Sequence, residues 1–121
     1  MMDKYFEALG SGDFSRFFTA DVTWTTIESG EEISGPLPVQ DAITALHAQL
    51  VDFRTRQLTV SDTSAYIEGS AVRRDGAPGR VAYCVAYDIN GDRINAMRAY
   101  GSLAALMAPT NEIKHGADRA P

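Results

Sequence analysis

Few side chains in this sequence could move a proton near neutral pH. His47 and Glu28 are the only plausible bases, because an imidazole titrates close to neutral pH and partial burial raises the pKa of a carboxylate toward it. The phenol of Tyr5 could donate a hydrogen bond to a substrate oxygen. We therefore expect Tyr5, Glu28 and His47 to be the catalytic candidates of any acid–base reaction.

A second set of candidates comes from the segment between Arg80 and Tyr100. Two strand-like apolar runs are joined there by Asn90-Gly91, a strong signal for a β-hairpin. One face of the first run is large and apolar: Val81, Tyr83, Val85, Tyr87 and Ile89. The other face is small: Ala82, Cys84, Ala86 and Asp88. We expect the large face to border a ligand cavity and the small face to contact another protein.

Alternation of side chains extends the cavity to neighbouring elements. Asn95, Met97 and Ala99 should share the inner side of the next strand, and Trp24, Thr26 and Glu28 should point inward from an earlier one. Tyr5 and His47 could close the wall from helices. The predicted ligand-binding residues for a small apolar ligand are therefore Trp24, Thr26, Tyr83, Val85, Tyr87, Asn95, Met97 and Ala99.

Each of these residues also has a purely structural explanation. Buried aromatic side chains commonly fill a core while their polar tips find partners. His47 could be a half-exposed histidine at the edge of a helix, and Glu28 could be a solvated residue before the Ser29-Gly30 turn. The sequence leaves both possibilities open.

The outer face of the predicted hairpin has two explanations as well. Arg98 and Tyr100 fall on the side opposite Met97 and could form a solvated sheet surface with acidic partners. The small residues Ala82, Cys84 and Ala86 favour a homodimer contact through this outer sheet face.

Composition excludes several classes of protein. The chain has 121 residues, 45% of them hydrophobic, which is enough for one core but too few for two ordinary domains. A net charge of -5 without a basic run argues against nucleic-acid binding. The apolar runs are too short for a membrane span, and the N-terminus does not resemble a signal peptide. A single cysteine fits a reducing compartment, so we expect a cytoplasmic protein.

We expect neither a metal nor an organic cofactor. His47 and His115 stand far apart, and the chain has no cysteine pair or Asp-rich loop. The glycines lie in predicted turns and do not form a phosphate-binding loop.

The order of elements predicts a single α+β domain. Helical patterns cover residues 5–9, a short segment after Asp13, and 36–50, while β-branched runs predict strands at 22–27 and 31–34. Further strands are predicted at 54–61, 65–74, 80–89 and 94–103, joined by short loops that require antiparallel neighbours. We expect a strongly curved antiparallel sheet wrapped on three helices over residues 1–108, followed by a flexible tail at 109–121.

Several short motifs occur together in one order. They are Tyr5 with Gly12-Asp13, Phe18 to Trp24, Ser34-Gly35 before a helix, Asn90 to Ile94, and Met97 to Tyr100. In this respect residues 3–106 resemble the nuclear-transport-factor-2-like superfamily, which has a cystatin-like fold, in its SnoaL-like branch. The resemblance implies a cone-shaped α+β barrel with an apolar pocket. Relatives include ketosteroid isomerase, limonene epoxide hydrolase and polyketide cyclases.

The resemblance also allows the relatives' chemistry to be checked residue by residue. Tyr5 matches the oxyanion tyrosine of ketosteroid isomerase, but Thr26 stands at the base position and Val85 at that of the protonated aspartate. Arg73-Arg74-Asp75 resembles the Arg-x-Asp segment of limonene epoxide hydrolase. However, Ala99 stands where that enzyme has the catalytic aspartate of its final strand, and the polyketide cyclases use an aspartate at the same place. The usual catalytic aspartates of these relatives are therefore missing.

Two functions remain open from the sequence. The chain could be a cofactor-free isomerase, cyclase or lyase acting on a small apolar substrate, with Tyr5 as donor and Glu28 or His47 as proton carrier. Alternatively, it could be a non-catalytic ligand-binding or dimeric accessory protein. The missing carboxylates favour the second function, but a fold alone does not decide between them.

Overall fold

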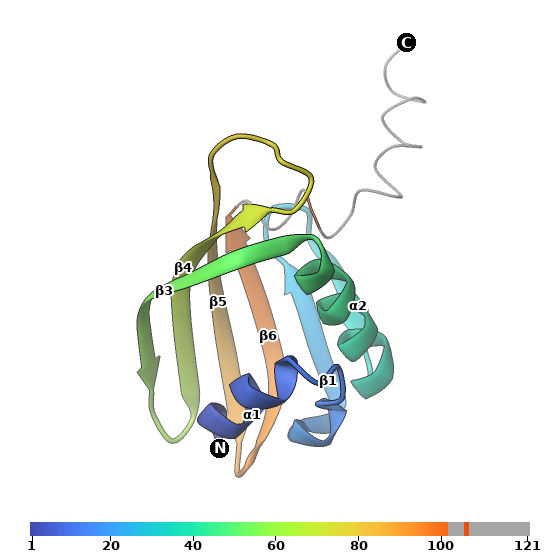
Figure 1. Cartoon of the computed structure of the whole chain (residues 1–121). Coiled ribbons are helices and arrows are strands. Elements are labelled where there is room, and N and C mark those ends of the chain that lie inside the picture. Colours follow the sequence, from blue (N-terminus) through green and yellow to red (C-terminus); the bar gives the residue numbers. More distant parts are fainter. Residues whose placement is uncertain (102–105, 107–121) are drawn as a thin grey trace.

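One six-stranded sheet with α-helices packed on it gives the described residues the α+β class that the sequence predicts. The computed structural model describes residues 1–101 and Leu106, so the predicted boundary at 108 and the predicted tail at 109–121 lie outside the described residues. The elements in chain order are α1 (Met2–Leu9), β1 (Phe18–Thr26), β2 (Glu31–Ser34), α2 (Pro36–Ala48), β3 (Leu50–Val60), β4 (Ser64–Arg73), β5 (Arg80–Asn90) and β6 (Arg93–Gly101). The sheet curves, and both helices lie on one of its faces (Figure 1).

The sheet is mixed, so the prediction of a purely antiparallel sheet is wrong. Its strand order is β2-β1-β6-β5-β4-β3, and β1 runs parallel to β6. The short hairpin loops from β3 to β6 impose antiparallel pairing, as expected. No such loop joins β1 to β6, because most of the chain lies between them, and their relative direction is therefore not fixed by a turn.

Within residues 1–101 the structure has two α-helices, where the sequence predicted three. The segment after Asp13 forms only a single 3-10 turn, Ser15–Phe17, and β1 begins at once at Phe18. Asp13 does not cap this turn. The backbone N–H groups of Phe14 and Ser15 instead donate to Oε1 of Gln40 in α2, both at 2.7 Å. A contact distant in sequence thus replaces the local cap.

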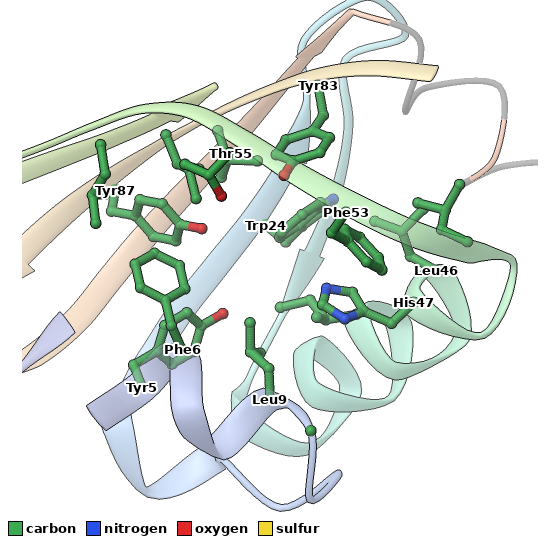
Figure 2. A pocket seen from close by; sticks show the side chains of 16 residues that line it. Tyr5, Phe6, Leu9, Trp24, Leu46, His47, Phe53, Thr55, Tyr83 and Tyr87 are labelled. Carbon is green, nitrogen blue, oxygen red and sulfur yellow. The ribbon is translucent and has the colours of Figure 1, made fainter. Parts of the chain in front are cut away.

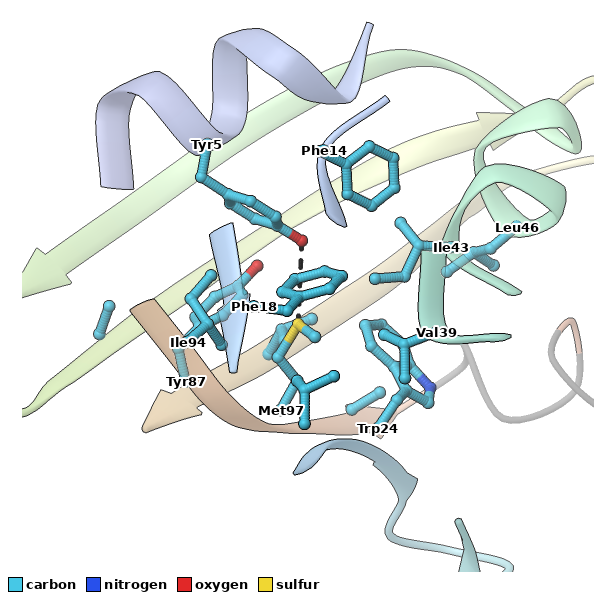
Figure 3. Packing of buried hydrophobic residues seen from close by; sticks show 14 of the residues in the cluster. Tyr5, Phe14, Phe18, Trp24, Val39, Ile43, Leu46, Tyr87, Ile94 and Met97 are labelled. Carbon is cyan, nitrogen blue, oxygen red and sulfur yellow. Dashed lines mark hydrogen bonds between the residues drawn. The ribbon is translucent and has the colours of Figure 1, made fainter. Parts of the chain in front are cut away.

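The core lies between the two helices and the inner face of the sheet. α2 begins with Pro36 in its first turn and buries Val39, Ile43 and Leu46 on one stripe. Tyr5 of α1 lies at the centre of the aromatic packing, edge-on to Phe14, and its Oη donates to Sδ of Met97 at 3.8 Å (Figure 3). The helices are therefore held to the sheet mainly by apolar contacts.

The edge strand β3 departs from regular alternation at two places. Its pairing with β4 shifts register between Val51 and Arg54 and again between Thr55 and Gln57, so β3 carries one extra residue at each place. Asp52 sits at the first bulge with a left-handed φ of 53°. Figure 1 shows β3 bending as it runs from the end of α2 to the far edge of the sheet. These bulges decide which β3 side chains face the helices.

Candidate functional site

A cavity of about 540 Å³ lies between the helices and the inner face of the sheet (Figure 2). Cavities of this size accommodate drug-sized molecules. Sixteen residues from α1, β1, α2, β3, β4 and β5 and the adjoining turns line it. They are Tyr5, Phe6, Leu9, Gly10, Trp24, Ile43, Leu46, His47, Leu50, Phe53, Thr55, Leu58, Ile67, Tyr83, Val85 and Tyr87.

The structure brings six of the predicted site residues together around this cavity. They come from four elements and are Tyr5, Trp24, His47, Tyr83, Val85 and Tyr87. The alternation of β5 places three of them on one face, as the sequence indicated. Their roles toward a ligand or substrate stay predictions.

Three other predicted residues are buried but lie outside the lining. Thr26, Met97 and Ala99 are at most 2% exposed and pack in the core. In the parallel pairing Thr26 stands opposite Ala99, and Trp24 stands opposite Met97. The three side chains therefore fill the core and do not border the cavity.

Asn95 also lies outside the lining, and the predicted alternation fails there. Asp88 pairs with Ala96 whereas Ile89 pairs with Ile94, so Asn95 is the extra residue of a bulge in β6. Ile94 consequently takes the inner position and is fully buried, while Asn95 is only half-buried.

Glu28 is not at the cavity mouth, contrary to the prediction from its position beside Trp24 and Thr26. β1 ends at Thr26, and Glu28 follows in an exposed turn. Its Oε2 accepts a hydrogen bond from the backbone N–H of Gly101 at 2.6 Å. The carboxylate therefore joins the end of β6 and does not face the cavity.

Sequence reasoning missed the wall that β3 contributes: Phe53, Thr55 and Leu58. Strict alternation from the buried Leu50 would turn Asp52, Arg54 and Arg56 inward. The two bulges avoid that by shifting the register, so that Phe53, Thr55 and Leu58 face the cavity. Three charged residues on one expected inner face are the sequence signal that could have revealed the bulges.

Gly69 allows Tyr83 to lie across the neighbouring strand. The two residues pair directly between β4 and β5. A Cβ added at Gly69 would lie 2.7 Å from Oη of Tyr83, which is closer than side-chain packing permits. The missing side chain therefore makes room for the phenol at this part of the cavity wall.

The electrostatics of the cavity favour uncharged groups. Burial raises the pKa of Tyr5 well above its usual range and also raises the pKa of Tyr87, so both phenols stay protonated and can donate hydrogen bonds. Burial lowers the pKa of His47, which favours the neutral imidazole. Nε1 of Trp24 is buried and finds no hydrogen-bond partner among the residues that the structure describes.

Neither a metal cluster nor a membrane-spanning helix is found in the described part of the chain. Residues 1–101 and Leu106 contain no group of three or more His, Cys, Asp or Glu side chains that could hold a metal ion. Their helices are also too short or too polar to cross a bilayer.

Comparisons with known proteins identify the fold. No family model matches the chain, and no curated protein does. Among solved structures, a steroid delta-isomerase from Pseudomonas aeruginosa superposes with a TM-score of 0.73 at 14% identity, over 95% of this chain and 91% of that one. An uncharacterised bacterial protein with a cystatin-like fold from Silicibacter pomeroyi gives 0.76 at 15% identity, over 92% and 82%. An NTF2-like protein of unknown function from Cytophaga hutchinsonii gives 0.64 at 20% identity, over 82% and 94%.

These likenesses show that the chain has the nuclear-transport-factor-2-like fold, which the resemblance in its sequence implied. At such identities they establish the fold alone. The activity has to be argued from the cavity itself.

Proposed function

We propose that this protein binds a small, uncharged, largely apolar molecule in the cavity between its helices and its sheet. The observation that carries the proposal is the lining: it holds six aromatic side chains, and among its described residues none is Asp, Glu, Lys or Arg. A charged ligand would lose its hydration there without gaining an opposite charge. An uncharged ligand gains apolar contact with all the walls.

The polar groups of the lining indicate what the ligand should carry. Figure 2 shows the hydroxyls of Thr55 and Tyr87 turned into the cavity, and Nε1 of Trp24 has no partner among the described residues. Tyr5 donates only to a thioether sulfur, which is a weak acceptor. Donors without strong partners favour a ligand with an acceptor oxygen, such as a carbonyl or an ether.

Trp24 makes this proposal easy to test, because it is the only tryptophan in the chain and lines the cavity. A panel of steroids, terpenoids, polyketide aromatics and short acyl compounds should contain molecules that change Trp24 fluorescence and raise the melting temperature. Uncharged compounds should change the fluorescence and the melting temperature, and their charged analogues should change neither. If no compound acts at concentrations well above micromolar, a ligand site at this cavity is untenable.

A second candidate function is cofactor-free acid–base catalysis in the same cavity. It is favoured by His47, an imidazole in the lining whose pKa burial lowers, so that it is neutral and able to accept a proton at pH 7. Tyr5 or Tyr87 would hold the substrate oxygen. In this arrangement an isomerase, cyclase or lyase would work without the aspartates of the related enzymes.

Two substitutions separate binding from catalysis once a panel compound is found to turn over. His47→Ala should abolish turnover but keep binding, and Tyr5→Phe should lower the turnover rate. Phe17→Leu is a suitable control, because Phe17 packs against Tyr5 yet does not line the cavity. Unchanged turnover in both variants would remove the catalytic assignments of His47 and Tyr5.

We further propose that the outer face of the sheet forms a homodimer contact. Tyr66 and Tyr100 stand 43% and 37% exposed beside a groove of about 270 Å³ whose lining includes Ala82 and Cys84. Light scattering should give twice the mass of one chain, and Ala82→Glu should give the monomer. A monomeric wild-type protein at high micromolar concentration would exclude this contact.

A further inference from the structure

We propose that Arg80, on the outer face of the sheet, positions Phe53 on the inner face and so determines how tightly the cavity is closed beside Trp24. The inference rests on the proposed function only in taking the cavity as the ligand site. It concerns the first bulge of β3 and the side chains that hold it.

Arg80 bridges three strands. It starts on β5, its Nε donates to Oγ of Ser70 on β4 at 2.7 Å, and its Nη1 donates to Oδ2 of Asp52 on β3 at 3.0 Å. Its Nη2 also donates to the backbone oxygen of Asp52 at 2.6 Å and to that of Ser70 at 3.3 Å. A guanidinium with a fixed fork suits such a multiple contact better than an ammonium would.

The residue that Arg80 holds has an unfavourable backbone conformation. Asp52 has a φ of 53°, in the left-handed region that few non-glycine residues adopt, and it is the extra residue between the pairs of Val51 and Arg54. Arg54 contacts the same carboxylate at 3.1 Å. Contacts to both the side chain and the backbone oxygen of Asp52 therefore stabilise the bulge against a regular strand.

The bulge sets the direction of the next side chain. Phe53 follows Asp52, faces the cavity, and has its ring centroid 5.1 Å from that of His47 and 6.3 Å from that of Tyr83. Figure 2 shows Phe53 of β3 between His47 and Tyr83, while Trp24 of β1 lines the same cavity. Phe53 is nevertheless 44% exposed and is far from fully packed. Its position therefore depends on the backbone that carries it more than on its own contacts.

Strand register explains why the effect must cross the sheet. Arg80 pairs with Val72, and Ser70 pairs with Arg54, on the side away from the cavity. Without the bulge, regular alternation would turn Phe53 outward and Arg54 inward. An ion pair in solvent thus selects which side chain closes an apolar cavity.

Acrylamide quenching of Trp24 tests this inference without any ligand. Acrylamide is small and uncharged, and Trp24 is the only tryptophan in the chain and is 4% exposed. Arg80→Gln should raise the quenching constant severalfold, because local opening at the bulge admits the quencher. Asp52→Asn should act in the same direction, since asparagine tolerates a left-handed φ but loses the charge.

Arg73→Gln is the matched control. Arg73 also forms a two-pronged exposed pair, with Asp75 at 2.7 and 3.3 Å, but neither residue lines the cavity. Its loss should leave the quenching of Trp24 unchanged.

A double variant separates positioning of Phe53 from a general loss of stability. Phe53→Ala should itself raise quenching, and adding Arg80→Gln to it should produce no further rise. Full additivity, or a folded Arg80→Gln protein with wild-type quenching, would overturn the inference. If Arg80→Gln does not fold, Ser70→Ala decides the question, because it removes only the Nε contact and should raise quenching in the same way. Since the readout needs no ligand, a negative compound panel would not decide this test.

Discussion

Two walls of the cavity differ in construction. On β5, Val85 and Tyr87 are 5% exposed, and simple alternation places them side by side on the inner face. On β3, Phe53 and Leu58 are 44% and 43% exposed. Phe53 faces inward because the first bulge shifts the register, and the second bulge shifts it back, so that Leu58 also faces the cavity. The β5 wall belongs to the hydrophobic core, whereas the β3 wall is an edge strand held by hydrogen bonds and ion pairs on its outer side.

This difference indicates that the two strands contribute differently to stability and to the shape of the cavity. A wall that is also core is costly to change, so the β5 side chains supply stability and fixed hydrogen-bond donors. A half-exposed edge wall can change its side chains at little cost to folding. We infer that the β3 wall is where selectivity for a ligand is adjusted.

The largest predicted effect is on stability. Tyr87→Ala should lower the free energy of unfolding by about 3 to 5 kcal/mol, as for other large buried aromatic side chains, because it leaves a void beside Tyr5 and Phe6. Phe53→Ala should cost less than about 1 kcal/mol, as for a partly exposed side chain. Urea unfolding followed by circular dichroism measures both values. Equal costs would contradict the division between the two walls.

A smaller effect concerns the hydrogen-bond donor of the β5 wall. Tyr87→Phe keeps the ring but removes the hydroxyl. The binding free energy of a ligand with an acceptor oxygen should therefore become less favourable by about 1 kcal/mol, which raises the Kd roughly fivefold. Titration calorimetry with an active panel compound measures this change. Tyr66→Phe, which alters an exposed phenol on the outer face, is the control and should leave the Kd unchanged.

The smallest predicted effect is a dependence of stability on pH. Burial lowers the pKa of His47 from its ordinary value of 6.5, so the unfolded chain takes up a proton first as the pH falls. Stability should therefore be full above about pH 6.5, fall below it, and level off once the folded protein is also protonated. The carboxyl groups of Asp52 and Asp88, whose pKa values are lowered by hydrogen bonds from Arg80 and Arg98, contribute only in stronger acid.

His47→Gln isolates the histidine contribution. Melting temperatures measured between pH 7 and pH 5 should then lose most of their slope. If the slope persists unchanged in the variant, another group is responsible for it.

Much of the architecture could be predicted from local patterns. The Asn90-Gly91 turn and the alternation from Val81 to Ile89 place β5 and β6 correctly, and the apolar stripe of Val39, Ile43 and Leu46 identifies α2. The parallel pairing of β1 with β6 and the cap supplied by Gln40 depend on contacts between distant segments. Local patterns contain no information about such contacts.

The residues that line the cavity were predicted where the strands are regular and missed where the strands are irregular. Tyr83, Val85 and Tyr87 follow the alternation of β5, and all three line the cavity. Asn95 was misplaced because a bulge in β6 shifts the alternation by one residue. The inner residues of β3 were not predicted, and the bulges in that strand interrupt its alternation. Glu28 was misplaced for a different reason, since the strand ends before it.

The central claim is that the cavity beside Trp24 is open to uncharged molecules and closed to charged ones. Methyl naphthyl ketone and the naphthoate anion have nearly the same shape and differ in charge, so titrating each against Trp24 fluorescence tests the claim directly. The account predicts saturable quenching by the ketone and none by the carboxylate over the same concentrations. Equal quenching by both compounds, or no saturable quenching by either, would contradict it.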